Sequence, residues 1–350
     1  MEEIKLERKM KLGIIGVCGF GGSHVIGASK VTCAEMVALC DLDLEGAKKW
    51  AKDYNVPYVY QDYKELLKRD DIEAVSIALP DQIHKQVTID ALRAGKHVLC
   101  EKPMALDLDE CKEMIKVARE CGKELMVGQV GRYTPAFRKA KELYESGAIG
   151  ELFLIESEYA HDYSKIGGAG GWRVTPEREP IIGGGCHAVD LIRMIAGNPE
   201  EVFAYANNKS LTDWPIHDCT MAVMKFPSGA IGKVMTSTGC KRRYTMRSVL
   251  YGTKGTIIFD NTSPYISLFK EEFTDNATFE DMDQQSMEIR IPVQINNHNL
   301  GGEIEDFCKC IAEGKPVVTS GVEGASTVSV CLSIVESFKT GKNIKVDYNF

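Results

Sequence analysis

The stretch "KLGIIGVCGFGGSH", residues 11–24, decides the fold. It joins a short apolar run to a glycine-rich turn, and the turn leads directly into a predicted helix. In that arrangement the backbone N–H groups of the turn and the helix N-terminus can cradle a pyrophosphate. Aligned on the pattern G-x-G-x-x-G, Gly16 and Gly21 take the first and third positions, and Cys18 takes the second with Gly19 beside it. The stretch therefore predicts a dinucleotide-binding turn.

The next strand-like run, "VALCDLD", ends in carboxylates. Asp41 follows Gly16 by 25 residues, close to the spacing of about 20 residues at which an acidic side chain binds the ribose 2′-hydroxyl of a dinucleotide. A carboxylate at that point repels a 2′-phosphate, so the spacing favours NAD over NADP, with NADP as the alternative. Asp43 is a nearby alternative carboxylate for the same contact.

Short apolar runs alternate with helix-like stretches from Lys11 to about Gly128. Such alternation is typical of βαβ units on a parallel sheet. We therefore expect an α/β fold in which residues 1–130 form a doubly wound Rossmann domain that binds NAD(P).

Longer strand-like runs follow "KAKELYESGAIG". Ser228-Gly229 and Lys254-Gly255 stand where hairpin turns are expected, so the flanking runs are predicted to pair antiparallel. Helix-like patterning returns from Glu303 to about Lys339. Residues 131–350 are therefore expected to form an α+β domain with a large, mostly antiparallel open sheet, used for substrate binding and oligomerisation.

Composition narrows the class of partner. A formal net charge of −8 provides no basic field for nucleic acid or an anionic membrane, so a small molecule is the expected partner. The 12 cysteines are dispersed through apolar runs without a C-x-x-C motif, which argues against both a disulfide framework and a metal site. The charged amino terminus lacks the apolar core of a signal peptide and no run is long enough to span a membrane, so we expect a cytoplasmic protein.

The run "KHVLCEKPMAL" places Lys102 at the carboxyl end of a predicted buried strand, where open parallel sheets bind ligands. A lysine there can polarise or deprotonate a substrate hydroxyl if burial or neighbouring positive charge lowers its pKa. The alternative is a solvated lysine paired with Glu101.

Several ordered motifs together resemble one enzyme family. They are the glycine turn with Asp41, "IALPDQIH", "AGKHVLCEKPMAL", "GWRV", "GGGCHAVDL" and the closing segments "GEIEDFCKCIAEGKPV" and "SIVESFKTGKNIKV". The chain is thereby similar, nearly end to end, to the glucose-fructose oxidoreductase / inositol dehydrogenase / rhizopine catabolism family of NAD(P)-dependent oxidoreductases.

The resemblance assigns roles to individual residues. Lys102 corresponds to the family lysine between nicotinamide and substrate, and Gln129 and Arg132 fall where the family contacts the nicotinamide end. The segment Ala78–Asp81 with His84 corresponds to the family segment beside the cofactor, although threonine is more usual than Leu79 and asparagine more usual than Asp81. The cofactor-binding residues expected on these grounds are Gly16, Cys18, Gly19, Phe20, Gly21, Asp41, Ala78, Leu79, Pro80, His84, Glu101, Lys102, Gln129, Trp172 and Arg173.

The second catalytic candidate is His187. It matches the histidine of the family pattern D-x-G-x-H-x-x-D, where it is usually the general base or orients the substrate. In this chain Gly183 replaces the first aspartate, so the usual trio of lysine, aspartate and histidine is incomplete. Asp190 supplies the last aspartate of the pattern, and its alternative role is that of a first-turn carboxylate favoured by the helix dipole.

Other residues are candidates for the substrate side. His161 and Asp162 follow a predicted strand, and His161 is equally well explained as a surface histidine. Tyr133 has a face that packs on sugar rings, although such residues more often fill the core. The substrate-binding candidates are therefore Arg132, Tyr133, His161, Asp162 and Asp190.

These features favour an NAD-dependent dehydrogenase that oxidises a secondary hydroxyl of a sugar, cyclitol or sugar derivative, with Lys102 and His187 as acid-base groups. The altered motif at Gly183 keeps open a redox-neutral glycoside-cleaving or epimerising enzyme that uses tightly bound NAD through a keto-sugar. The third hypothesis is a non-catalytic NAD-binding sensor. The family resemblance also implies a homodimer or homotetramer.

Overall fold

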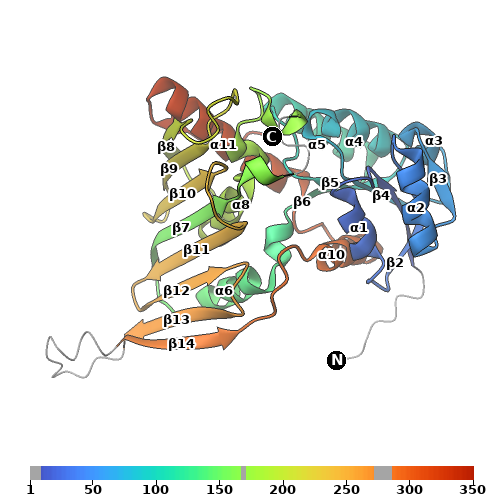
Figure 1. The fold of residues 1–350 in the computed structure, drawn as a ribbon. Helices are drawn as coiled ribbons and strands as arrows, with labels where there is room; N and C mark the ends of the chain where they lie inside the picture. The colour runs from blue at the N-terminus through green and yellow to red at the C-terminus, as the bar shows by residue number, and fades with distance from the viewer. Residues whose placement is uncertain (1–8, 167–170, 272–285) are drawn as a thin grey trace, which may run out of the picture. The chain divides into compact units, whose positions relative to one another are not determined.

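The computed structural model describes residues 9–166, 171–271 and 286–350 (Figure 1). The chain forms two compact units. The first comprises Met1–Val130, Asn299–Val328 and Asn349–Phe350, and the second comprises Gly131–His298 and Ser329–Tyr348. The sequence places a domain boundary between residues 130 and 131, and the structure additionally assigns residues 299–328 to the first unit.

The first unit is built on a six-stranded parallel sheet. Its strands are β1 (Met10–Ile15), β2 (Ala34–Cys40), β3 (Tyr58–Tyr60), β4 (Ala74–Ile77), β5 (His97–Glu101) and β6 (Leu125–Gly128). They lie in the order β3-β2-β1-β4-β5-β6, with Ile15 at the end of β1 opposite Cys40 on one side and Ile77 on the other. This order confirms the doubly wound Rossmann sheet, and its topological switch point lies between β1 and β4.

Short polar residues set the ends of the helices in this unit. The helical elements are α1 (Gly21–Ala28), α2 (Leu44–Tyr54), α3 (Tyr63–Leu67), η1 (Asp81–Ile83), α4 (His84–Arg93), α5 (Leu108–Cys121) and α10 (Leu300–Ala312). The carboxylates of Asp43, Asp62 and Asp107 accept hydrogen bonds from the first turns of α2, α3 and α5. Asn55 and Gly122 end α2 and α5 in the left-handed conformation.

The late segment joins the first unit through close backbone contacts. A Cβ at Gly27 of α1 would lie 3.0 Å from the Cβ of Leu300, so this glycine allows α10 to pack directly on α1. The backbone N–H of Val127 in β6 donates to the carbonyl of Thr319 at 2.7 Å, and the Thr319 hydroxyl donates back to the Val127 carbonyl. The helix-like patterning in the sequence predicted these helices but not the unit to which they belong.

The second unit is built on a nine-stranded sheet. Its strands are β7 (Leu152–Ala160), β8 (Glu201–Asn207), β9 (Cys219–Lys225), β10 (Ile231–Ser237), β11 (Thr245–Gly252), β12 (Gly255–Asp260), β13 (Tyr265–Glu271), β14 (Ser286–Pro292) and β15 (Ile344–Lys345). The order is β14-β13-β12-β11-β7-β10-β9-β8-β15. Pairing is parallel between β7 and β10 and antiparallel at the other described pairs, which confirms the mostly antiparallel sheet.

Both hairpins predicted from dipeptides are present. Ser228-Gly229 lies in the turn between β9 and β10, with Gly229 at a φ of +87°. Lys254 and Gly255 lie at the junction of β11 and β12, where Gly252 pairs with Gly255. Strands β14 and β15 were not predicted.

Helices cover one face of the second sheet. The helical elements are η2 (Val130–Tyr133), α6 (Pro135–Glu145), η3 (Tyr163–Lys165), η4 (Trp172–Val174), α7 (Pro180–Gly183), α8 (Cys186–Ala196) and α11 (Gly321–Thr340), of which α11 begins in the first unit. Helix α8 packs on β7 and β10, and α6 packs on β12 and β13. In β9 the buried Ala222 and Met224 alternate with the exposed Met221 and Val223, as expected of a strand with one covered face. In the described part of the chain, no helix is long and apolar enough to cross a membrane.

Candidate active site

The glycine turn of the first unit is shaped by two close approaches. Gly16 has a φ of +91°, and a Cβ there would lie 2.5 Å from the carbonyl oxygen of Ala78 at the end of β4. A Cβ at Gly21 would lie 1.7 Å from the carbonyl oxygen of Gly16. Both positions therefore require glycine, and the turn lies at the switch point, where sheets of this topology bind nucleotides.

Asp41 and the second position of the glycine pattern are connected directly. The backbone N–H of Cys18 donates to Oδ2 of Asp41 at 2.7 Å, and the N–H of Asp43 donates to Oδ1 at 3.0 Å. Both carboxylate oxygens are thereby oriented at the carboxyl end of β2, and each retains a lone pair for a ribose hydroxyl. Asp43 instead caps α2, because its own carboxylate accepts from the N–H of Gly46 at 3.0 Å.

The side chain of Cys18 lies away from the turn's glycines. Its Sγ contacts the carbonyl oxygen of Asp43 at 3.7 Å, and a Cβ at Gly46 would lie 2.5 Å from that sulfur. Burial and the carboxylates of Asp41 and Asp43 raise the pKa of the Cys18 thiol to about 11. The thiol is therefore protonated at neutral pH, and the backbone of Cys18 makes the contact with Asp41.

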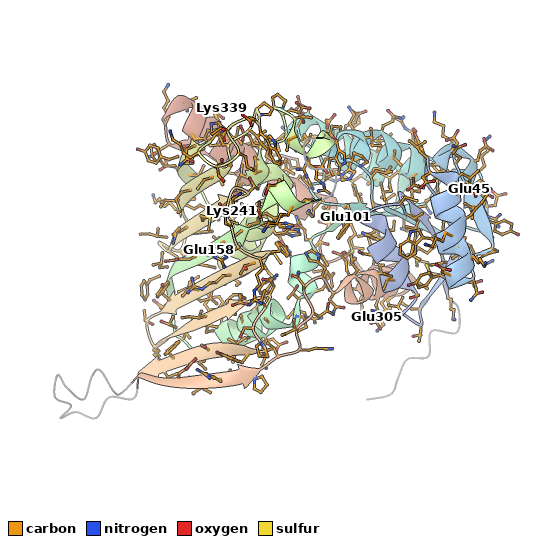
Figure 2. All side chains as sticks on the ribbon, in the orientation of Figure 1. Glu45, Glu101, Glu158, Lys241, Glu305 and Lys339 are labelled. Carbon is orange, nitrogen blue, oxygen red and sulfur yellow. The ribbon has the colours of Figure 1, made fainter. Side chains whose placement is uncertain are left out.

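A buried polar network holds the strand end that carries Lys102. Oε1 of Glu101 is 3.0 Å from Nε2 of His24, and Nδ1 of His24 is 2.8 Å from the hydroxyl of Ser76. The other oxygen of Glu101 accepts from the backbone N–H of Lys102 at 3.1 Å. Figure 2 labels Glu101 at the end of β5. Burial alone would raise the pKa of Glu101, but the hydrogen bond and charge of His24 and the charge of Lys102 keep it below its ordinary value.

Sequence reasoning missed this network, although His24 belongs to the stretch that decided the fold. His24 and Ser76 are completely buried, and Glu101 is almost so. The available signal was a histidine three residues after Gly21, on the helix that leaves the glycine turn. Spacing alone does not reveal that this helix face meets the end of β5.

His84 links two segments that the sequence assigned to the cofactor. Its Nε2 is 2.9 Å from the carbonyl oxygen of Leu79, and its Nδ1 is 2.9 Å from that of Pro103. Burial would lower its pKa, but Cys100, Asp81 and the Pro103 carbonyl raise it to about 10. A protonated imidazole can donate to both carbonyls, so His84 stabilises the loops after β4 and β5.

Gln129 provides a further test of whether this unit fits a dinucleotide. It follows β6 and is buried, and its side-chain Oε1 has no hydrogen-bond partner among the described residues. Buried carbonyl oxygens are normally paired, so this atom is suited to accept from a bound group. Together with the glycine turn and the oriented Asp41, Gln129 fits an NAD molecule.

In the second unit His187 belongs to an aromatic stack. It lies in the first turn of α8 and is buried. Its ring is 6.1 Å from that of Tyr159 at an interplanar angle of 19°, and 5.7 Å from that of His298 at 25°. His298 and Tyr159 were not predicted from the sequence, because they come from segments distant in the chain.

Phenol and imidazole groups extend this stack. The Tyr159 hydroxyl is 3.1 Å from Nδ1 of His161, and the Tyr244 hydroxyl is 3.2 Å from Nε2 of His298. Burial and the neighbouring Tyr163 raise the pKa values of Tyr159 and Tyr244 far above the ordinary value, so both phenols remain protonated. His161 thus lies in the same cluster as His187, which we call the histidine-tyrosine cluster: Tyr159, His161, Tyr163, His187, Tyr244 and His298.

The three glycines before His187 leave space that side chains from other segments occupy. A Cβ at Gly184 would lie 2.6 Å from Tyr159, and one at Gly185 would lie 2.1 Å from the hydroxyl of Thr236. A Cβ at Gly183 would lie 2.2 Å from Nη1 of Arg178. The guanidinium of Arg178 therefore occupies the volume into which any side chain at position 183 would project.

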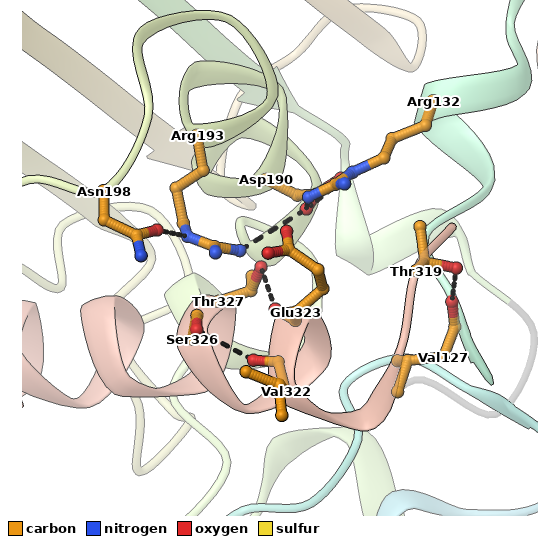
Figure 3. A network of polar contacts seen from close by, with 10 residues as sticks. All are labelled: Val127, Arg132, Asp190, Arg193, Asn198, Thr319, Val322, Glu323, Ser326 and Thr327. Atoms are coloured by element: carbon orange, nitrogen blue, oxygen red, sulfur yellow. Dashed lines mark hydrogen bonds and ion pairs between the residues drawn. The ribbon is translucent and has the colours of Figure 1, made fainter. Parts of the chain in front are cut away.

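Two predicted substrate residues bind each other. Arg132 donates to both carboxylate oxygens of Asp190, at 2.7 Å from Nη2 and 2.9 Å from Nε (Figure 3). Arg193 lies 3.8 Å from the same carboxylate and donates to Asn198 at 2.8 Å. Asp190 is thus a buried ion-pair partner.

Asp162 and Tyr133 are the remaining candidates for the substrate side. Asp162 accepts from the hydroxyl and N–H of Ser164 and pairs with Lys165 and Lys241. Tyr133 is buried. Within the described ranges, no group of three or more His, Cys, Asp or Glu side chains is arranged to hold a metal ion.

Two guanidinium groups make cation–π contacts with the indole ring of Trp172. The guanidinium carbons of Arg173 and Arg178 lie 4.3 Å and 4.9 Å from its ring centroid, and Nη1 of Arg178 donates to the carbonyl of Arg173 at 3.2 Å. Trp172 and Arg173, both predicted from the sequence, thus lie beside the guanidinium that reaches Gly183.

Comparison with known proteins agrees with this arrangement. Residues 10–129 match the family model described as "Oxidoreductase family, NAD-binding Rossmann fold", and residues 137–258 match the GFO/IDH/MocA C-terminal domain. The chain is 30% identical to an uncharacterized oxidoreductase, ORF334, of Rhizobium meliloti, over 72% of this chain and 75% of that protein. It is 26% identical to myo-inositol 2-dehydrogenase of Thermotoga maritima, over 97% of this chain and 99% of that protein.

The fold is also that of a solved enzyme complex. Levoglucosan dehydrogenase in complex with NADH and levoglucosan superimposes with a TM-score of 0.88 at 23% identity, covering 97% of this chain and 100% of the other. This similarity establishes the shared two-unit fold. The two family models, which together match more than half of the chain, show that it belongs to the GFO/IDH/MocA family of oxidoreductases and that its first unit is an NAD-binding Rossmann domain.

Proposed function

We propose that the protein is an NAD-dependent dehydrogenase that oxidises a secondary hydroxyl of a sugar, cyclitol or sugar derivative. The observation that carries this proposal is the anchoring of Lys102 by the buried Glu101 at the end of β5. In the same sheet, the glycine turn and the oriented Asp41 fit NAD. The names of related sugar and cyclitol dehydrogenases supply the substrate class.

The chemistry divides between the cofactor and the side chains. The glycine turn and Asp41 would hold NAD, which would supply the hydride acceptor for the carbinol carbon of the substrate. The hydroxyl proton passes to a base as the ketone forms, so the products are a ketone, NADH and one proton. We assign the base to His187 and the polarisation of the same oxygen to Lys102.

Substitution of each proposed catalytic residue tests this assignment. We expect Lys102→Ala and His187→Ala to bind NADH as the native protein does and to lose about 10²- to 10⁴-fold in kcat. Lys116→Ala, at an exposed position on α5, is the matched control. A near-native kcat in either site variant would remove the role given to that residue.

The altered motif at Gly183 favours one alternative, a redox-neutral enzyme that oxidises and re-reduces its substrate on tightly bound NAD. The observation behind it is that a guanidinium stands where the family carboxylate is expected. Net NADH accumulation during steady turnover separates the two functions. A redox-neutral enzyme would release cleaved or epimerised product without accumulating NADH.

We further propose that the uncovered face of the second sheet forms the interface of a homo-oligomer. Phe153, Tyr205, Met221, Val223 and Ile231 are exposed apolar side chains on strands β7 to β10. Met221 pairs with Tyr205 across β9 and β8, and exposed apolar side chains on neighbouring strands are typical of protein interfaces. We expect the Met221→Lys/Val223→Lys variant to dissociate into monomers. Light scattering of this variant and of the native protein measures the change in mass.

A further inference from the structure

Two cysteines meet where the late segment of the chain packs on the Rossmann sheet. Cys33 lies in the loop between α1 and β2, and Cys308 lies on α10. Both residues belong to the first unit. The thiol of Cys308 donates a hydrogen bond to the sulfur of Cys33. One packed unit thus holds in contact two thiols that are separated by most of the chain.

The backbone around each thiol fixes this contact. The close approach of Gly27 to α10 continues along the chain, and Sγ of Cys33 lies 3.9 Å from the carbonyl oxygen of Glu305. Cys308 follows Glu305 by three residues on the same helix. On the other side, the carbonyl of Cys33 accepts from the N–H of Met10 in β1 at 2.8 Å. The two sulfur atoms are therefore brought together by the fold itself.

The surroundings of Cys33 favour its thiolate. The hydrogen bond from Cys308 lowers the pKa of the Cys33 thiol below its ordinary value, and the positive charge of Lys309 acts in the same direction. Burial and the carboxylate of Glu305 oppose these effects. The same hydrogen bond and burial raise the pKa of Cys308. Because the thiolate is the nucleophilic form, Cys33 is the attacking sulfur and Cys308 is its protonated partner.

Cys33 lies just beneath the surface. It is 5% exposed, compared with 1% for Cys308, and it follows the exposed Thr32. The charges of Glu305 and Lys309 act on Cys33, and these two side chains form an ion pair at 42% and 48% exposure (Figure 2 labels Glu305). The thiolate therefore borders side chains that are in contact with solvent. A peroxide is close to water in size, so it needs no preformed cavity to reach this sulfur.

We propose that Cys33 and Cys308 form a reversible redox modification site, which a hydroperoxide oxidises to an intramolecular disulfide. The Cys33 thiolate attacks one peroxide oxygen, so an S–O bond forms and the O–O bond breaks. The proton lost by Cys33 converts the leaving hydroxide to water. The sulfur of Cys308 then attacks that of Cys33, the S–O bond breaks, and a second water leaves with the Cys308 proton. Two thiols and one hydrogen peroxide thus give one disulfide and two waters, and a dithiol reductant reverses the change.

The site does not depend on the proposed dehydrogenase function. Its disulfide would fasten α10 to the segment that joins α1 to β2, and it would close a loop that contains most of the chain. Cross-links that close long loops stabilise a fold mainly by restricting the unfolded chain. We expect the oxidised protein to unfold about 3–10 °C above the reduced protein and a dithiol to abolish the difference.

Peptide mapping of the full chain tests the site. Reduced protein is treated with hydrogen peroxide, quenched in acid, alkylated and digested with trypsin and a glutamate-specific protease. Cleavage after Glu35 separates Cys33 from Cys40, so their products are distinguished. We expect a pair of peptides joined through Cys33 and Cys308, which dithiothreitol separates again.

Variants assign the two roles. Cys308→Ser removes the second thiol, so Cys33 should accumulate as a sulfenic acid that dimedone captures. Cys33→Ser should leave Cys308 reduced at the same peroxide concentration. Thermal unfolding of each reduced variant checks that the fold is retained.

Cys310 provides the matched control. It lies on the same helix and is 9% exposed, but burial and the carboxylate of Asp306 raise its pKa. Cleavage after Lys309 separates its peptide from that of Cys308. Cys310→Ser should still form the disulfide. In the native reduced protein, iodoacetamide should alkylate Cys33 about 10-fold faster than Cys310 at neutral pH.

Three results would overturn the proposal. The first is the absence of the joined Cys33–Cys308 peptides at peroxide concentrations that oxidise Cys310. The second is a disulfide between Cys33 and any other cysteine. The third is alkylation of Cys33 no faster than that of Cys310, which would remove its role as the nucleophile. An oxidised protein that unfolds at or below the temperature of the reduced protein would overturn the stabilising role of the disulfide.

Discussion

The imidazole of His24 contacts the carboxylate of Glu101 at 3.0 Å between Nε2 and Oε1, and both side chains are buried. This contact joins α1, which leaves the glycine turn, to the strand end that carries Lys102. Glu101 in turn accepts from the Lys102 backbone at 3.1 Å. The element that fits the pyrophosphate and the proposed catalytic lysine are therefore held by one buried polar network.

Loss of His24 should be costly because it leaves a carboxylate buried without its partner. We expect His24→Leu to lower the free energy of unfolding by about 3–5 kcal/mol, measured by urea denaturation. The double variant His24→Leu/Glu101→Gln no longer buries the negative charge of Glu101, so it should recover part of that loss of stability. If His24→Leu and the native protein have the same free energy of unfolding, the contact contributes nothing measurable to the fold.

Asp41 should determine the choice of cofactor. Its two oxygens are fixed by the N–H groups of Cys18 and Asp43, so the carboxylate is oriented before any ligand binds. We expect Asp41→Ala to weaken NADH binding about 10- to 100-fold and to reduce discrimination against NADPH, as measured by fluorescence titration. Asp43→Asn keeps the cap of α2 and should leave the NADH/NADPH ratio unchanged. An unaltered ratio in Asp41→Ala would exclude the ribose contact.

Gly16 and Gly19 form a matched pair for testing the turn. Both have positive φ, at +91° and +126°, but a Cβ at Gly16 would lie 2.5 Å from the Ala78 carbonyl, whereas none of the described atoms lies within 4 Å of a Cβ at Gly19. Alanine should cost about 1–3 kcal/mol at each site through backbone strain. Gly16→Ala should cost more, because the loop after β4 must also move. Equal unfolding midpoints for the two variants would show that the close approach to Ala78 is not limiting.

The sequence predicted the elements whose signals are local. The glycine turn, Asp41 and the two hairpin dipeptides each depend on neighbouring residues, and the parallel and antiparallel sheets are confirmed. The assignment of residues 299–328 to the first unit depends on contacts such as Gly27 with Leu300, which no local pattern reveals.

The same distinction applies to the site. The absence of a carboxylate at Gly183 was visible in the sequence, but its replacement by Arg178 depends on how a loop five residues earlier folds back. His298 follows β14, the edge strand of the second sheet, and its ring stacks on that of His187. Asp190 matched the family pattern, yet its carboxylate is bound by Arg132. A pattern thus located the segment, while tertiary contacts determined which side chains gather there.

His97 should make stability depend on pH in the acid range. Burial and the positive charge of Lys123 lower its pKa to about 4, and its Nδ1 accepts from the N–H of Glu124 at 3.1 Å. The neutral ring is therefore favoured in the folded state, whereas the unfolded chain takes up a proton near pH 6.5. Its stabilising contribution is present above pH 6.5 and is lost as the pH falls through about 4.

Urea denaturation between pH 7.5 and pH 4 measures this effect. The stability difference between the native protein and His97→Gln should be largest above pH 6.5 and should shrink toward pH 4. Lys123→Met removes the repulsion and should narrow the pH range over which stability falls. A difference that does not vary with pH would exclude His97 as the titrating group.

The pair formed by Arg132 and Asp190 should act as a structural unit. Three hydrogen bonds of 2.7 Å, 2.9 Å and 3.2 Å join them, and both side chains are largely buried. Arg193 lies 3.8 Å from the same carboxylate. Asp190→Ala leaves two guanidiniums without their shared anion, so we expect a loss of about 3–5 kcal/mol in the free energy of unfolding. Arg132→Met combined with Asp190→Leu should lower the free energy of unfolding less than Asp190→Ala alone does. The double variant leaves neither position 132 nor position 190 with a buried charge that lacks its partner. If Asp190 bound substrate instead, Asp190→Ala would raise KM sharply with little change in stability, and this pair of measurements separates the two roles.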